Sequence, residues 1–442
     1  MEQGNFKDFN GDIFGQIFSH FGKQFKGFNN GGGPKKKGSF VGFLKWLALA
    51  YIAIAISKFL ASDLILDVSL SAFYIVAPFV VVSVLYGLTH SMKKLPIIGI
   101  VVAILYGVVL FLCSPILNYK AHRDLVGTVD EIEFSNEIEH IDLKQLPTID
   151  TQLAAKLADK KLGEIPSLGS QVTIGELHLQ SIGGQLYYVA PLEHSSLIKW
   201  LTNREGTSGY IKVSATNQND VQLVTELDGK PLKIKYLESS YLLSDLHRAA
   251  FLRDMKSAHT DFTFELDDNG RPYWVVTRYD NAIGITEAKA IGALVIDAQT
   301  GESEIYDIDN MPKWIDRIQP SKFINNYINK WGELVHGVFN FNDKDKLKTT
   351  TGMNLIFNKD ECFYYTGITS VGNDEGLVGF TLTNTRTGKT TMYKTAGATE
   401  EAAIRSAEGK VQQYGYKATF PYLINIQGEP TYFTTLKDSN GL

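Results

Sequence analysis

Residues 97–117 read IIGIVVAILYGVVLFLCSPIL and contain no charged side chain. A helix of this length crosses the roughly 30 Å of hydrocarbon in a lipid bilayer. Residues 41–60 and 68–88 are similarly apolar, and none of the three runs contains Asp or Glu. The sequence therefore predicts three transmembrane helices within residues 41–117, and the lack of acidic side chains argues against an ion or proton pathway.

The charges beside these runs predict the orientation in the membrane. Lysines precede the first run and separate the second from the third, whereas aspartates lie between the first and the second. These residues are Lys35, Lys36, Lys37, Lys93 and Lys94, and Asp63 and Asp67. Because basic flanks stay in the cytoplasm, we expect a cytoplasmic N-terminus and an extracytoplasmic C-terminal part, residues 118–442, at a bacterial cell membrane.

Residues 1–40 are predicted to be a cytoplasmic amphipathic and flexible segment. Phenylalanines recur there at helical spacing, at Phe14, Phe18, Phe21, Phe25 and Phe28. A helix would place the rings on one face and lysines beside it, as in helices that lie on an anionic lipid surface. The alternative is an unstructured tail, because several glycines weaken helix formation.

Composition argues against several kinds of function. The formal net charge is −5, and no concentrated basic stretch is available to neutralise nucleic-acid phosphates. Cys113 lies in an apolar run and Cys362 in the soluble part, so the two cysteines cannot pair across the membrane boundary. We expect no nucleic-acid partner, no disulfide and no cysteine-based metal site, which suits a bacterial surface.

The soluble part contains an internal repeat of hairpins. Residues 262–276 form one around Asp268-Asn269-Gly270, and residues 291–306 form a second around Thr300-Gly301. The hairpins of other copies lie at residues 355–367 and 379–393, 177–191 and 209–215, and, in part, from Leu423 onward. A segment of helical periodicity precedes each copy, at residues 151–162, 241–256, 321–336 and 399–414.

The stretch Val295-Ile296-Asp297-Ala298-Gln299-Thr300-Gly301-Glu302 resembles the D-x-x-T-G-[EK] hairpin of PepSY-type modules, which are small extracytoplasmic domains of bacteria. Over nearly its whole length the chain is similar to uncharacterised bacterial membrane proteins with several spans and PepSY-like repeats. The first copy departs from the pattern, because it lacks the Thr-Gly pair. The resemblance implies an envelope location and a binding or regulatory role, and it brings no catalytic residues.

The expected fold class is α+β, with an N-terminal three-helix transmembrane region followed by tandem PepSY-like modules, each a helix plus a small antiparallel sheet. The expected modules are residues 118–230, 231–312, 313–397 and a partial fourth, 398–442. That fourth copy ends without a return strand, which we interpret as a truncation or as a deliberate half module. Its edge strand would be open to pairing with another chain.

An aromatic pair occupies the equivalent point of each hairpin, and side chains alternate between the two faces of a strand. We therefore expect one member of each pair on the face away from the helix. The candidate binding residues are Tyr188, Trp274, Tyr365 and Phe433. They either form a row that binds an extended peptide or glycan, or pack one module against the next.

Motifs for catalysis, cofactors or metals are incomplete. Residues 265–270 resemble the start of a calcium loop but lack its final glutamate, so we favour a turn. Ser196 and Lys199 match a Ser-x-x-Lys pair without its companion motifs. An acidic cluster is better explained as a solvated strand face than as a metal site, and its members are Glu137, Glu139, His140 and Asp142.

Three function hypotheses follow. The first is a non-enzymatic envelope protein that is anchored in the bilayer and binds an extracytoplasmic protein or peptide as a scaffold or regulator. The second is a self-assembling homo-oligomer, joined through strand edges or through the small residues Gly99, Ala103 and Gly107 of the third run. The third is an envelope enzyme acting on peptide or peptidoglycan, which requires a pocket with converging titratable groups.

Overall fold

The computed structural model describes residues 38–60, 68–134, 146–358, 361–372, 376–426 and 429–438. The five phenylalanines of the predicted amphipathic segment lie outside these described residues. So does the acidic cluster of Glu137, Glu139, His140 and Asp142.

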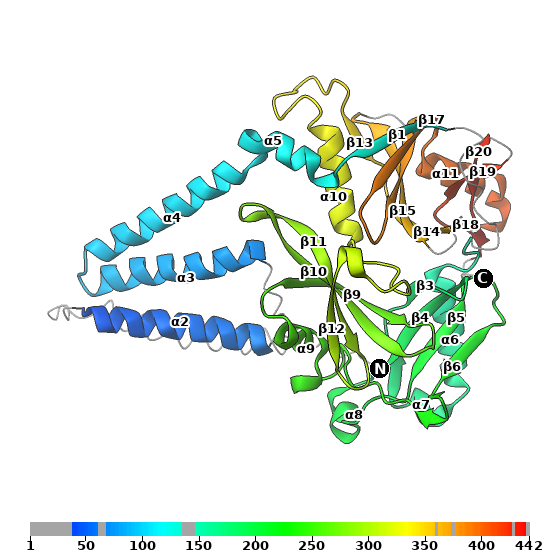
Figure 1. Cartoon of the computed structure of the whole chain (residues 1–442), viewed down its shortest axis with the longest axis horizontal. Coiled ribbons are helices and arrows are strands. Elements are labelled where there is room, and N and C mark those ends of the chain that lie inside the picture. The colour runs from blue at the N-terminus through cyan, green and yellow to red at the C-terminus, as the bar shows by residue number, and fades with distance from the viewer. Residues whose placement is uncertain are drawn as a thin grey trace. The chain divides into compact units, whose positions relative to one another are not determined.

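Three long apolar helices occupy the N-terminal part of the chain (Figure 1). They are α2 (Phe40–Leu60), α3 (Val68–Thr89) and α4 (Lys94–Cys113). Each is long and apolar enough to cross a membrane, which confirms the prediction of three such helices. The third ends four residues before its predicted end at Leu117, because Ser114 precedes Pro115 and adopts an extended conformation that a following proline favours.

Gly99 brings α4 close to α3. A Cβ atom at this position would lie 3.0 Å from the Ser83 Cβ and 3.2 Å from the Val80 carbonyl oxygen. Any larger residue would have to push these neighbours aside. Packing within the chain therefore accounts for the glycine at position 99 without a second copy of the protein.

After these helices, the order of one helix followed by an antiparallel sheet occurs three times (Figure 1). We call these units the first, second and third modules. The first contains α6 (Thr151–Gly163), β2 (Val172–Ile174), β3 (His178–Ile182), β4 (Gln185–His194), β5 (Tyr210–Ser214) and β6 (Val221–Val224). The second contains α9 (Leu246–Arg253), β9 (Ala258–Leu266), β10 (Pro272–Ile283), β11 (Thr286–Asp297) and β12 (Ser303–Asp307).

The third module contains α10 (Ser321–Glu333), β13 (Leu347–Thr349), β14 (Asn354–Asn358), β15 (Glu361–Ser370), β16 (Gly376–Asn384) and β17 (Thr390–Ala398). A C-terminal segment follows, with α11 (Glu400–Lys410), β18 (Lys417–Ala418), β19 (Tyr422–Ile426), β20 (Glu429–Phe433) and β21 (Leu436–Lys437). Shorter elements are α5 (Pro115–Arg123), β1 (Val129–Glu133), α7 (Pro166–Gly169), α8 (Leu197–Thr202), β7 (Glu226–Leu227) and β8 (Lys230–Pro231). The predicted mixture of helix and sheet is confirmed, and the likeness to PepSY modules stays a prediction.

Strand β1 departs from the predicted module boundaries. It pairs in parallel with β17, so that Val129 lies opposite Thr390 and Glu133 lies opposite Lys394. This strand therefore belongs to the sheet of the third module, although we expected it in the first. The alternation of side chains identifies a strand, but it does not identify the distant edge that the strand joins.

The repeated motif has a repeated turn geometry. In the second module, Asp297 Oδ1 accepts hydrogen bonds from the N–H groups of residues 299 and 300 at 2.9 and 2.7 Å. In the third, Asn384 Oδ1 accepts from residues 386 and 387 at 3.1 and 3.0 Å. Gly301 and Gly388 close these turns with φ of 74° and 75°. In the first module, which lacks the Thr-Gly pair, Ser214 Oγ accepts from residues 216 and 217 at 3.2 and 3.1 Å.

A single residue of the segment after β12 connects all three modules. The Asp316 Oδ2 atom accepts a hydrogen bond from the Ser181 N–H of the first module at 2.8 Å. The Asp316 N–H donates to Glu265 of the second module at 3.0 Å, and its carbonyl oxygen accepts from the Thr385 hydroxyl of the third at 2.5 Å. The modules therefore fold against one another through buried polar contacts as well as shared apolar cores.

Candidate functional site

A hollow of about 230 Å³ lies between the first and second modules. Its polar lining comes from β2 and the residues up to the start of β3, from the end of β4 and from the segment before α9. The polar side chains are Thr173, Glu176, His178, Glu193, His194, Glu238 and Ser239. We call this hollow the acidic pocket. Small ligands commonly bind in such concave places between domains, where a few polar groups converge.

Glu193 is the buried carboxylate of the acidic pocket. It lies on β4 opposite Thr173 of β2, and it accepts hydrogen bonds from the hydroxyl and, at 3.0 Å, from the N–H of Ser239. The Ser239 oxygen in turn accepts from the His194 N–H at 2.8 Å. Burial raises the pKa of Glu193 to about 7, although the hydrogen bonds from Ser239 act in the opposite direction. This carboxyl group therefore changes its charge near neutral pH.

Gly175 makes room for the Glu193 side chain. A Cβ atom at position 175 would lie 3.0 Å from the Pro191 Cγ and 3.1 Å from the Glu193 Cγ. The Gly175 N–H also donates to the Pro191 carbonyl oxygen at 2.9 Å, which holds the chain close to β4. A larger residue at position 175 would displace the carboxylate or the strand.

His178 contributes a neutral imidazole. Its Nδ1 lies 3.3 Å from Nη2 of the partly buried Arg317. Because a guanidinium only donates, Nδ1 accepts and the proton of the ring lies on Nε2. Burial and the Arg317 charge lower the pKa of His178 to about 3. Its Nε2 is buried and has no hydrogen-bond partner among the described residues.

The remaining titratable groups make the acidic pocket negative. The Glu238 side chain is 49% exposed and lies 3.8 Å from His247 Nε2. Burial raises the pKa of Glu238, and the nearby Glu176 raises it further, whereas His247 lowers it. Burial also lowers the pKa of His194, so that this ring favours its neutral form. The lining described above therefore has three carboxyl groups and no Lys or Arg side chain.

The three carboxyl groups of the acidic pocket can accept hydrogen bonds from an organic cation. Across the described ranges, no group of three or more His, Cys, Asp and Glu side chains is placed to hold a metal. An ammonium or guanidinium group donates hydrogen bonds to carboxylates and needs no fixed coordination geometry.

The four aromatic residues predicted as a binding row do not form one. Tyr188, Trp274 and Tyr365 are only 5%, 2% and 0% exposed, and Phe433 is partly buried opposite Tyr422. Trp274 lies in a core shared by the first and second modules, and Tyr188 in a core shared by the first and third. The expectation of an exposed row is thus contradicted, and the alternative of packing between modules applies to the three buried side chains.

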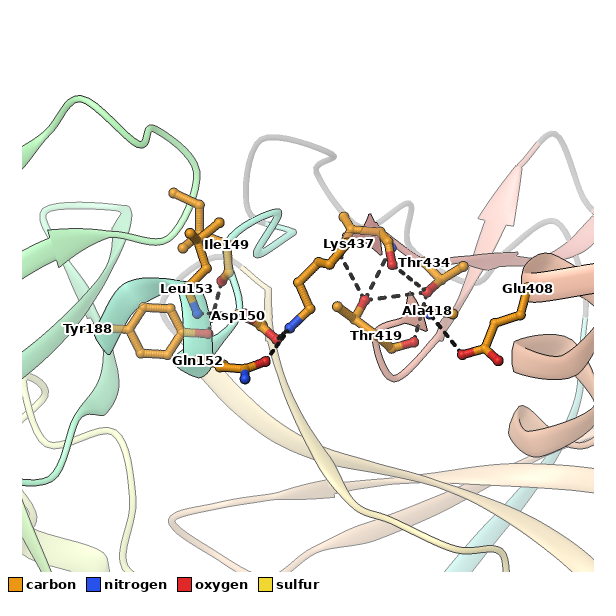
Figure 2. A network of polar contacts seen from close by, with 11 residues as sticks. Ile149, Asp150, Gln152, Leu153, Tyr188, Glu408, Ala418, Thr419, Thr434 and Lys437 are labelled. Atoms are coloured by element: carbon orange, nitrogen blue, oxygen red, sulfur yellow. Dashed lines mark hydrogen bonds and ion pairs between the residues drawn. The ribbon is translucent and has the colours of Figure 1, made fainter. Parts of the chain in front are cut away.

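Figure 2 shows the contact between the first module and the C-terminal segment near Tyr188. The Tyr188 hydroxyl donates to the Ile149 carbonyl oxygen at 3.0 Å. Next to it, the Lys437 ammonium contacts the Asp150 carboxylate and donates to Gln152 Oε1 at 3.1 Å. Tyr188 therefore belongs to an interface within the chain, where it is not available to a ligand.

Sequence reasoning missed the polar residues of the acidic pocket, although the predicted residue Trp274 forms part of its lining. The available signal was Glu193-His194, two ionisable residues at the end of an otherwise uncharged strand, together with Glu176 just before β3 and His178 at its start. Their hydrogen-bond partner Ser239 lies 46 positions after Glu193. No spacing rule connects such distant segments, and only the docking of the second module on the first brings them together.

Two motifs weighed in the sequence have structural explanations. Asp267 Oδ1 accepts hydrogen bonds from the N–H groups of Asn269 and Arg271 at 2.9 and 2.8 Å, so this stretch is the predicted hairpin turn. Ser196 is the N-cap of α8, and its Oγ accepts from the Lys199 N–H at 3.4 Å. Neither motif forms part of the acidic pocket.

Comparisons with known proteins do not assign the chain to a family. No family model and no curated protein matches it. One solved structure that shares 9% identity is an endo-arabinase from Bacteroides thetaiotaomicron, and the match covers 59% of this chain and 73% of that one. Its TM-score of 0.17 is too low to support any conclusion about fold or activity.

Proposed function

We propose that this chain is a membrane-anchored, non-enzymatic binding protein of the bacterial envelope, and that its acidic pocket holds a basic side chain of an extracytoplasmic protein or peptide. The observation that supports the proposal is the convergence of Glu176, Glu193 and Glu238 in a hollow whose polar lining offers no cation. Among them Glu193 is buried, and a buried carboxylate needs a positive partner when it is ionised, because water cannot solvate its charge.

His178 favours a peptide over a free amine as the ligand. Its buried Nε2–H has no acceptor among the described residues. A peptide carbonyl oxygen would accept this hydrogen bond while a lysine or arginine side chain meets the carboxylates. A peptide that has both a carbonyl oxygen and a basic side chain would bind His178 and the carboxylates at the same time.

The location outside the cell rests on the charges that flank the apolar helices. Lys93 lies between α3 and α4, and Lys94 is the first residue of α4. Such basic flanks stay in the cytoplasm. An odd number of crossings then puts the acidic pocket on the outer side. This placement is tested by introducing a cysteine at the exposed position 198. On intact cells, a thiol reagent that cannot cross the membrane should label this cysteine.

Binding is tested with the full-length protein in lipid nanodiscs and two capped tripeptides, one with a central lysine and one with the same lysine acetylated. We expect only the charged peptide to bind, as measured by microscale thermophoresis. The double variant Glu193→Gln and Glu238→Gln should bind it about ten-fold to a hundred-fold more weakly, because charged hydrogen bonds are lost.

The matched control is Glu226→Gln, which removes an exposed carboxylate outside the acidic pocket. It should leave the affinity unchanged. Equal binding of the charged and the acetylated peptide, or equal loss of affinity in the control and the double variant, would refute the proposed site.

An enzyme acting on peptide or peptidoglycan is the second candidate. One observation favours it: the Glu193 carboxyl accepts a hydrogen bond from the Ser239 hydroxyl and has a pKa of about 7, the range in which a general acid or base works best. A peptide that is cleaved by the wild-type protein, but not by Ser239→Ala, would replace the binding proposal with this one.

A further inference from the structure

The C-terminal end of α4 and the following α5 contact the second module. His122, in α5, is buried, with its Nε2 2.8 Å from the Cys113 carbonyl oxygen at the end of α4. The other ring nitrogen lies 3.3 Å from the Glu287 carboxylate, which belongs to β11. At the turn between β10 and β11, Gly284 leaves no room for a Cβ atom against the Cys113 sulfur.

The third module is tied to the same place. The Glu287 carboxylate also contacts the Lys330 ammonium and accepts a hydrogen bond from Asn326 at 3.1 Å, both from α10. From α5, Arg123 Nε donates to the Trp331 carbonyl oxygen at 3.4 Å. The helix α10 is therefore fixed near the point where α4 ends, and the loop that follows α10 begins there (Figure 1).

This loop, residues 334–346, presents two phenylalanines to solvent. Phe339 is 70% exposed and Phe341 is 83% exposed, and their ring centroids lie 6.0 Å apart. Leaving two adjacent aromatic rings in water is unfavourable, so such a pair commonly marks a contact surface.

The base of the loop lies close to α5, which follows the end of α4. A Cβ atom built at Gly337 would lie 3.8 Å from the ring of Tyr119 in α5. Apolar exposed surface continues past α4 to Ile116 and Leu117, which are 49% and 50% exposed. Tyr119 follows Leu117 by two residues, so even an extended chain would separate them by only about 7 Å. The headgroup layer on each side of the hydrocarbon is roughly 5–8 Å thick.

The loop also offers polar groups. It surrounds a hollow of about 530 Å³, which the two phenylalanines share with His336, Asn340, Asn342 and Lys344. Aromatic rings beside an amide and a cation match the boundary between acyl chains and phosphates.

We propose that Phe339 and Phe341 insert into the lipid headgroup region where α4 leaves the bilayer, so that the 334–346 loop is a second membrane contact of this chain. The partner is the lipid surface itself. The proposal rests on α4 crossing the membrane, and it holds for either orientation of the chain.

The test places a nitroxide spin label on the full-length protein in vesicles of phosphatidylcholine and phosphatidylglycerol. The variant Phe341→Cys carries the label on the loop, and Ile198→Cys carries it at a 69% exposed apolar position on α8. The parent chain with its two native cysteines supplies the background. Both substitutions replace exposed side chains and should leave folding intact.

We expect the label at position 341 to collide more with oxygen, which concentrates in lipid, than with a water-soluble nickel complex, and the label at position 198 to show the reverse. The same preference at both positions overturns the proposal. The measurement is repeated in nanodiscs that hold one copy each. If the label at position 341 is shielded from the nickel complex in vesicles but not in these nanodiscs, it contacts a second copy of the protein. That result also overturns the proposal.

Discussion

The side chain of Gln180 and the backbone of Leu266 exchange two hydrogen bonds. The Gln180 amide donates to the Leu266 carbonyl oxygen at 2.7 Å, and its oxygen accepts from the Leu266 N–H at 2.9 Å. Gln180 lies on β3 of the first module and is 1% exposed, whereas Leu266 is the last residue of β9 in the second. One side chain therefore satisfies both backbone groups of a buried strand end across a module boundary.

Gln180→Leu should destabilise the protein by about 2–4 kcal/mol, because it leaves a buried N–H and a buried C=O of Leu266 without partners. The free energy of unfolding is measured by urea titration of the full-length protein in mild detergent. Gln222→Leu, at an exposed position of β6, is the control and should change stability little. Similar losses in the two variants would show that the paired hydrogen bonds contribute no stability.

The aromatic residues of the hairpins give the second prediction. Trp274→Ala and Tyr365→Ala each create a cavity in a core and should cost about 3–5 kcal/mol. Phe433→Ala, at a partly exposed position, should cost less. The three unfolding free energies are compared in the same detergent. If all three variants were equally stable, packing between modules would not explain these side chains.

Local patterns predicted the helices and hairpins of the chain well. The periodicity of residues 151–162 corresponds to α6 (Thr151–Gly163), and the Asp268-Asn269-Gly270 turn joins β9 to β10. These elements depend on interactions between near neighbours, such as the Asp150 cap on the Leu153 N–H, which are readable from the sequence.

Contacts between distant segments could not be read in this way. Strand alternation puts Trp274 and its neighbour Tyr273 on opposite faces of β10, yet segments distant in the sequence cover both faces. The first module packs on the side of Trp274, and the segment with Ile315 and Ile318 covers the other side. The same docking puts Ser239 against Glu193 and creates the acidic pocket. Burial by a partner module depends on tertiary packing, and the period of one strand carries no information about it.

The equivalence of the Asp297 and Asn384 turns gives the third prediction. Asn384 makes the turn without a charge, so Asp297→Asn should keep the turn and lose only the ion pair with Arg271, which spans 2.5 Å and is partly exposed. We expect a loss of about 0.5–1 kcal/mol. Asp297→Ala also removes the acceptor for two N–H groups and should cost about 1–2 kcal/mol more. Equal losses in both variants would assign the whole effect to the ion pair.

The pH dependence of stability gives the fourth prediction. Burial raises the pKa of Glu193 from 4.5 to about 7, so the folded protein binds this proton more tightly than the unfolded chain does. The stability that the protonated carboxyl contributes is fully present below pH 4.5 and is lost as the pH rises to about 7. The shift, 7 minus 4.5, corresponds to roughly 3 kcal/mol.

Glu193→Gln keeps the size of the side chain and removes this titration. The stability of the variant should therefore fall less between pH 5 and pH 8 than that of the wild-type protein. Glu265 is also buried, and its raised pKa makes the stability of both proteins fall as the pH rises. The test therefore compares, at one ionic strength, how much the free energy of unfolding changes between pH 5 and pH 8 in each protein. Glu226→Gln should retain the wild-type pH dependence. If Glu193→Gln retained it too, Glu193 would not be the group that titrates near neutral pH, and the acidic pocket would keep its charge throughout this range.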